Sequence, residues 1–304
     1  MIKTRLVKLL SHTKKYIVQM VLWQWIALLG QIAAIVSIGR MIDRILMHQM
    51  SSKVVLMTFM ILAIAVAIRF LCDQMATRAS FAASVDVKRI LREKIYDKLL
   101  RLGASYREHV STSEVVQMST EGVEQLEIYF GKYLPQLFYS ILAPVTLFII
   151  LSFISLKASA VLLICVPLIP ISIVAVQKLA KKLLKKYWGL YTTLGDSFLE
   201  NLQGMTTLKI YQADEMKAVE MDEQAQNFRK ITMKVLTMQL NSTSVMDIIA
   251  YGGAAVGMIT AIHQYIAGNI TLGGTLIILL LASEFFIPLR LLGSFFHIAM
   301  NGMA

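Results

Sequence analysis

Residues that build metal centres and disulfides are scarce in this sequence. Its 304 residues include two cysteines, Cys72 and Cys165, which lie in different apolar segments, and no CxxC motif occurs. This arrangement predicts neither a disulfide nor a zinc site. A membrane haem electron carrier would need paired histidines inside the membrane, and only His263 and His297 lie in or near apolar segments. We therefore expect neither a resident metal nor an electron-transfer centre.

A phosphate-binding loop is also missing. Such a loop follows the pattern GxxxxGK[ST], whereas the one Gly-Lys pair, Gly131-Lys132, precedes Tyr133 and lacks the upstream glycine. Residues 252–257 match only the glycine spacing and lie in an apolar segment. The sequence therefore predicts no ATP site and no catalytic residues, so this chain by itself is not expected to be an enzyme.

Acidic residues are few, with 19 against 30 lysines and arginines, which gives a net charge of +11. In a soluble protein such an excess favours nucleic-acid binding. Here the basic residues gather at the ends of apolar segments, where the positive-inside rule places them in membrane proteins. Hydrophobic residues make up 57% of the chain, and its mean hydropathy is +0.64. The sequence predicts an all-α polytopic membrane protein without a nucleic-acid partner.

Six apolar segments are long enough to cross a membrane as helices. They lie near residues 16–38, 54–75, 133–153, 158–179, 245–267 and 272–292. Lysine and arginine number five in residues 1–15, nine in 78–132 and ten in 178–234, whereas the opposite loops carry little positive charge. This asymmetry places both termini and the two long gaps in the cytoplasm. Residues 1–15 are expected to form a short helix along the membrane surface.

Prolines occur in the third and fourth of these segments. Each one removes a backbone donor, so Pro135, Pro144, Pro167 and Pro170 are expected to bend their helices. Bends that fit the bundle are the simpler interpretation than a gate.

The second and fourth segments continue into polar gaps that still favour helix. Residues 54–102 contain no proline. As one helix they would measure about 73 Å at 1.5 Å per residue, against a hydrocarbon core of about 30 Å, so more than half must stand in water. The same plan in both gaps predicts two helical hairpins that project into the cytoplasm, each with a transverse tip.

At the first tip, Gly103 is expected to end the long helix, and residues 111–114 (STSE) match a capping box. A short helix over 112–119 would follow, and Thr120 would cap the next long helix. At the second tip a short helix is expected over 209–217. The tip residues expected to transmit motion are Ser111, Thr112, Glu114, Tyr211, Asp214 and Glu215. Because the tips lack catalytic residues, we interpret them as docking surfaces for a cytoplasmic partner.

Six spans, two long hairpins and the segment 283–290 (SEFFIPLR) together resemble the transmembrane domain of a type I ABC exporter, over essentially the whole chain. More narrowly, residues 124–136 (EQLEIYFGKYLPQ) and 284–297 are similar to the CydD-type subunit of the exporter required for cytochrome bd assembly. This resemblance implies that an ATP-binding domain, with ATP and Mg²⁺, follows residue 304.

The resemblance also implies partners, cargo and location. A CydC-type half-transporter would complete a heterodimer around one translocation path in the bacterial plasma membrane, in contact with lipid. The cargo would be a small thiol, cysteine or glutathione, with haem as a linked or competing ligand. An exporter of haem, lipid, peptide or another small molecule is the alternative within the family. A passive channel or membrane scaffold is the alternative outside it, although a channel would need neither transverse tips nor an ATPase.

Ionisable residues inside the membrane are costly, so those in the spans are candidates for the cargo cavity. Arg69 and Asp73, four residues apart, can pair on one helix face, and both a structural ion pair and a cargo contact remain open. Glu284, Arg290 and His297 recur at six to seven residues and are expected to form one stripe along a cavity. Arg69, Arg290 and His297 would form its positive side. His297 is also a candidate haem contact, although a lone histidine more often serves helix packing.

Overall fold

The computed structural model describes residues 14–48, 51–108 and 110–301. Over these ranges the chain is built from helices and contains no β-strand, which confirms the predicted fold class. Six helical units are long and apolar enough to cross a membrane. The expected surface helix over residues 1–15 lies almost entirely outside the described residues.

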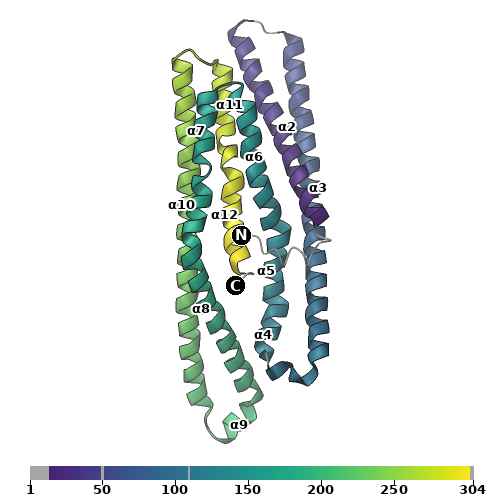
Figure 1. The fold of residues 1–304 in the computed structure, drawn as a ribbon, viewed down its shortest axis with the longest axis vertical. Helices are drawn as coiled ribbons and strands as arrows, with labels where there is room; N and C mark the ends of the chain where they lie inside the picture. Colours follow the sequence, from purple (N-terminus) through teal and green to yellow (C-terminus); the bar gives the residue numbers. More distant parts are fainter. Residues whose placement is uncertain (1–13, 49–50, 109, 302–304) are drawn as a thin grey trace.

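Consecutive units are joined by short turns and run antiparallel, so the molecule is a long bundle (Figure 1). The first two units are α2 (Lys14–Leu46) and α3 (Ser52–Leu102). The third is the continuous helix Thr112–Ser152, made of α4 (Thr112–Gln117), η3 (Met118–Gly122), α5 (Val123–Ile128), η4 (Tyr129–Tyr133) and α6 (Leu134–Ser152). The last three are α7 (Leu156–Cys165) with α8 (Leu168–Gln203), then α10 (Asp214–Ile266), then α11 (Leu272–Ala282) with η5 (Ser283–Phe285) and α12 (Ile287–Asn301). With 51 and 53 residues, α3 and α10 are far longer than a membrane is thick.

Beyond the spans, α3 and the helix that starts at Thr112 form the first hairpin, and α8 and α10 form the second (Figure 1). Gly103 ends α3, as predicted, with a φ of 54° that glycine adopts at little cost. The two hairpins touch where α4 meets α8. There the Gln117 amide donates to the Tyr191 carbonyl at 3.4 Å, and a Cβ on Gly195 would lie 2.6 Å from Ser113 Oγ. A side chain at Gly195 would therefore force the side chains of Ser113 and Gln117 to move.

The first tip differs from the prediction. Its short helix is η2 (Gly103–Glu108), and residues 112–119 instead begin the returning helix. Ser111 does cap that helix, because its hydroxyl accepts a hydrogen bond from the Glu114 amide at 3.1 Å. The prediction that Thr120 is a cap was wrong: its hydroxyl donates to the Val116 carbonyl at 2.8 Å, inside a helix that continues through the π-helical turns η3 and η4. Bonding to the i−4 carbonyl lets threonine sit within a helix.

The second tip is displaced along the chain. Its short helix is α9 (Met205–Ile210), and α10 already begins at Asp214, so the predicted helix over 209–217 was wrong. Gln212, with a φ of 51°, turns the chain between the two. Asp214 and Glu215 lie in the first turn of α10, where negative charge is favoured by the helix dipole.

Proline positions explain local features of the spans. Pro135 has no amide hydrogen to give to the Gly131 carbonyl one turn earlier, and that carbonyl accepts a hydrogen bond from Ser80 Oγ of α3 at 2.9 Å instead. Pro167 separates α7 from α8, whereas Pro144 lies inside the unbroken helix α6. The freed carbonyl therefore becomes a contact between spans.

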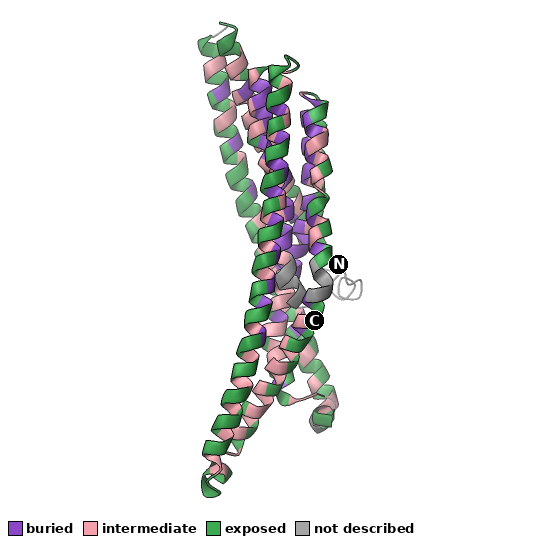
Figure 2. Cartoon of the chain, turned by 90° about the vertical axis from the view of Figure 1, so that its left-hand side faces the viewer, coloured by how far each residue is buried: buried purple, intermediate pink, exposed green. Residues whose placement is uncertain are grey.

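The core lies in the membrane-spanning half. Buried residues concentrate there, while the hairpins are mostly exposed or intermediate (Figure 2). The largest fully buried side chains include five aromatics, Tyr129, Phe130, Tyr133, Phe285 and Phe286. The sixth unit is the most buried, with 56% of its apolar window inside the chain. This last span therefore lies at the centre of the bundle, where it contacts α2, α6, α8 and α10.

At the end of the bundle away from the hairpins, α2 is tied to α11. The Asp43 carboxylate accepts hydrogen bonds from the Thr271 hydroxyl and the Gly273 amide, both at 2.7 Å. A carboxylate at a helix N-terminus satisfies a free amide and suits the helix dipole. Asp43 therefore fixes the start of the sixth span.

Candidate cargo site and hairpin tips

A chain of hydrogen bonds links three spans at the depth of Arg69. The amide oxygen of Gln31 in α2 accepts a hydrogen bond from the Arg69 guanidinium of α3 at 2.8 Å. The amide nitrogen of Gln31 donates to the Glu284 carboxylate of η5 at 2.7 Å. The glutamine uses both ends of its amide and joins a cation and an anion that belong to different helices.

Asp73 completes this group from the same face of α3 as Arg69. Its carboxylate lies 4.0 Å from Arg69 Nε, which is an ion pair at its outer limit and too long for a hydrogen bond. The two side chains are 55% and 67% exposed. Tyr139 of α6 lies within electrostatic range of all three charged groups. The structure thus brings Arg69, Asp73 and Glu284 together around Gln31 and leaves the first two accessible.

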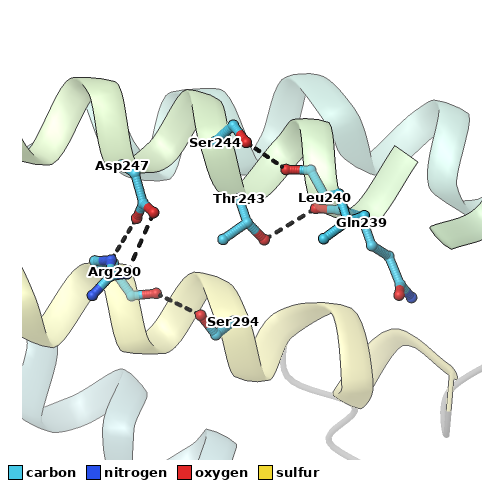
Figure 3. Close-up of polar contacts among 7 residues, drawn as sticks. All are labelled: Gln239, Leu240, Thr243, Ser244, Asp247, Arg290 and Ser294. Carbon is cyan, nitrogen blue, oxygen red and sulfur yellow. Dashed lines mark hydrogen bonds and ion pairs between the residues drawn. The ribbon is translucent and has the colours of Figure 1, made fainter. Parts of the chain in front are cut away.

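Arg290 belongs to a different cluster. Its Nε and one terminal nitrogen both donate to the Asp247 carboxylate of α10, the second at 3.3 Å, as Figure 3 shows. Its guanidinium carbon also lies 5.6 Å from the centre of the Tyr251 ring. A two-bond arginine–carboxylate pair with an aromatic neighbour is a strong contact between helices.

The predicted single stripe on the last span was therefore wrong. Glu284 bonds toward α2, whereas Arg290 bonds toward α10. Six residues advance an α-helix by about 240°, and the 3₁₀ turn η5 adds a further change of phase. The side chain of His297 lies outside the described residues, so its place in a cavity and its haem contact stay predictions.

Sequence reasoning missed Gln31 and Asp247. Asp247 is the only acidic residue in 245–267, and that isolation was a usable signal for a partner of Arg290. Gln31 is neutral within a long apolar run, and nothing in its local pattern points to Arg69 or Glu284.

At the first tip, the predicted coupling residues lie at the start of the returning helix. Ser111 caps that helix, and the Thr112 hydroxyl lies 3.2 Å from the Tyr106 hydroxyl of η2. Glu114 lines a cavity of about 400 Å³ between the hairpins, together with Gln117 and Trp188. These residues hold the base of the tip in place, while η2 forms its end.

At the second tip, Tyr211 follows α9 and is 77% exposed. Lys209 and Asp214 form an ion pair across the turn, and the hydrogen bond from the Lys209 ammonium lowers the pKa of the Asp214 carboxyl. Asp214 is therefore engaged within the tip, whereas Glu215 is exposed. An exposed aromatic on a turn that is closed by an ion pair suits a docking anchor.

In the part of the chain that the structure describes, no three histidine, cysteine, aspartate or glutamate side chains are placed to hold a metal ion. Cys72 and Cys165 are both free. The polar groups described in the membrane-spanning half can bind charged parts of a ligand.

Comparison with known proteins identifies the family. The model of the ABC transporter transmembrane region matches residues 19–289. An uncharacterized ABC transporter ATP-binding protein of Haemophilus influenzae is 54% identical over 283 residues, which are 93% of this chain and 50% of that protein. The glutathione/L-cysteine transport system ATP-binding/permease protein CydC of Bacillus subtilis is 26% identical over 212 residues, 70% of this chain and 37% of that protein. Its counterpart CydD of Escherichia coli is 25% identical over 286 residues, 89% and 48%.

The chain spans about half the length of the curated relatives it matches, or less. CydC and CydD proteins are similar to it at nearly the same identity, so these matches support the exporter resemblance without separating the two subunit types. Six membrane-crossing helical units and the match over residues 19–289 agree on a multi-pass membrane protein. The chain belongs to the ABC transporter transmembrane family.

Proposed function

We propose that this chain is the transmembrane half of an ATP-driven exporter of a small thiol, cysteine or glutathione, in cytochrome bd assembly. The observation that carries the proposal is the group around Gln31. There a half-exposed guanidinium, Arg69, stands between two carboxylates, Asp73 and Glu284. Both thiols carry carboxylate and ammonium groups at neutral pH, and the site offers an opposite charge to each.

The chemistry of Arg69 favours a carboxylate. A guanidinium holds a carboxylate through two parallel hydrogen bonds, and only one of the Arg69 donors is used by Gln31 in this structure. Asp73, which is 67% exposed, is available to a ligand ammonium. The names of the CydC and CydD relatives, at 26% and 25% identity, support the same class of cargo.

The same proposal includes the partners. ATP-binding domains, with ATP and Mg²⁺, would dock on the two hairpin tips, and a CydC-type half-transporter would complete the path. The exposed apolar residues of α3, such as Phe70 at 62% and Phe81 at 70%, leave surface for lipid or for that second half. The excess of lysine and arginine in the hairpins supports an inner-membrane orientation with both termini in the cytoplasm.

Transport into inverted membrane vesicles tests the cargo. Vesicles that contain the intact transporter with both halves should take up labelled cysteine or glutathione only when ATP is supplied. Vesicles with this chain alone, without an ATP-binding domain, are the control and should show no ATP-dependent uptake. If the intact transporter moves neither thiol but moves haem or a lipid, the thiol proposal is wrong and the alternative within the family replaces it.

A further inference from the structure

The second hairpin carries a basic cavity between α8 and α10, on the part of both helices that extends beyond the spans. Lys186 and Leu190 of α8 enclose about 330 Å³ together with Asn227, Lys230, Ile231 and Lys234 of α10. None of these three lysines forms an ion pair with any residue in the described ranges. Three uncompensated ammonium groups around one cavity create a site for an anion.

An apolar groove adjoins this cavity. Lys234 lines both, and the other walls of the groove, of about 560 Å³, include Leu183, Met233, Met238 and Val245. Along α10 the basic cavity spans residues 227–234 and the groove spans 233–245. The groove therefore runs from the lysines to Val245, where the fifth apolar segment begins.

From this order we propose that the cavity and groove together bind an anionic phospholipid of the leaflet on the hairpin side. The phosphate lies among Lys186, Lys230 and Lys234, and an acyl chain follows the groove toward the bilayer. Basic pockets beside membrane-spanning helices are suited to anionic headgroups, and methionines adapt to a flexible chain. The bound lipid bridges α8 and α10 and so braces the second hairpin against the membrane.

A soluble phosphate compound is the other source of the same chemistry. It would use the three lysines but would leave the apolar groove empty. A zwitterionic lipid fits the groove but not the charge of the cavity. Only an anionic lipid uses both parts in the order in which the structure arranges them.

Native mass spectrometry of the transporter in an uncharged detergent tests this site, with phosphatidylglycerol and phosphatidylcholine as probes. The variant K186Q/K230Q/K234Q should lose affinity for phosphatidylglycerol by about fivefold for each lysine removed. The control K181Q/K182Q/K185Q removes the same charge from exposed positions of α8 outside both cavities and should bind within about twofold of the unchanged protein. Melting temperatures of both variants should match, because all six lysines are exposed.

A second part of the experiment tests the apolar groove. Met233 is 53% exposed, so Met233→Gln should fold normally and weaken phosphatidylglycerol several-fold, while glycerol phosphate should compete poorly with the lipid in every variant. Equal losses in the two triple variants would mean diffuse attraction, and equal binding of phosphatidylcholine would remove the role of the lysines. Strong competition by glycerol phosphate together with no effect of Met233→Gln would assign the cavity to a soluble phosphate. Each of these results overturns the proposal.

Discussion

Two arginines of the membrane-spanning bundle are held in different ways. Arg290 gives two hydrogen bonds to the charged carboxylate of Asp247 and is 37% exposed, whereas Arg69 gives one to neutral Gln31 and is 55% exposed. A carboxylate balances a guanidinium, while an amide satisfies one donor and leaves the charge. Position inside a membrane therefore does not by itself mark a binding residue. Arg290 joins α12 to α10, and Arg69 is the arginine that we propose binds the cargo.

The largest expected effect is on stability, at Arg290. Replacing Arg290 by Met leaves the Asp247 carboxylate unpaired and should lower the free energy of unfolding by about 2 kcal/mol. That is less than for a fully buried pair, because both side chains are partly exposed, at 37% and 30%. The melting temperature in detergent measures this. The double variant Arg290→Met with Asp247→Leu should recover most of the loss, and a double variant as unstable as the single one would contradict the pairing.

A smaller loss is expected at Gln31, which joins the second cluster. Gln31→Leu removes one hydrogen bond from Arg69 and one from Glu284 and should cost about 1 to 2 kcal/mol. Gln24 is a matched control, since it lies seven residues earlier on the same face of α2, and its buried amide oxygen has no hydrogen-bond partner in the described structure. Gln24→Leu should therefore be neutral or slightly stabilising. Equal losses at both positions would mean that the bonds of Gln31 contribute nothing.

Arg69 itself should matter least for stability. Arg69→Met keeps apolar bulk but removes the exposed, loose contact with Asp73 and one hydrogen bond to Gln31, so it should cost about 1 kcal/mol. The double variant Arg69→Met with Asp73→Asn separates the two interpretations of the pair. If Arg69→Met lowers the melting temperature strongly and the double variant restores it, the pair is structural and the contrast with Arg290 fails.

Away from both arginines, Tyr211→Ala should leave insertion and the melting temperature unchanged, because the side chain is 77% exposed. In the intact transporter it should weaken the coupling of ATP hydrolysis to transport, as loss of an aromatic anchor weakens a docked surface. Measuring ATP hydrolysis and thiol uptake on the same vesicles checks this. An unchanged ratio of uptake to hydrolysis would remove Tyr211 from that role.

The sequence predicted the architecture better than its details. Long apolar runs and a proline-free polar gap predicted the six spans, the long helix α3 and the two hairpins, because each signal is local. Ser111 was also found locally, from the capping pattern. The role of Thr120 was predicted wrongly because threonine fits both a cap and a helix interior. The helix also continues through two π-helical turns that no residue pattern predicted.

Only part of the candidate site was predicted, because most of its contacts join residues that are far apart in the sequence. Arg69 and Asp73 are four residues apart, so their pairing follows from helix geometry. Gln31 meets Arg69 and Glu284 across 38 and 253 residues, and Arg290 meets Asp247 across 43. Such contacts depend on which helix faces pack together, and one sequence does not specify that packing. The stripe of Glu284 and Arg290 failed on the same ground.

Stimulation of ATP hydrolysis by cargo shows directly whether Arg69 recognises the cargo. In the intact transporter, cysteine or glutathione should raise the rate of ATP hydrolysis. Arg69→Met should abolish that rise while leaving the basal rate unchanged and lowering the melting temperature only slightly, because a recognition contact is lost and the fold is not. Full stimulation by thiol in the folded Arg69→Met transporter would contradict the claim that Arg69 recognises the cargo.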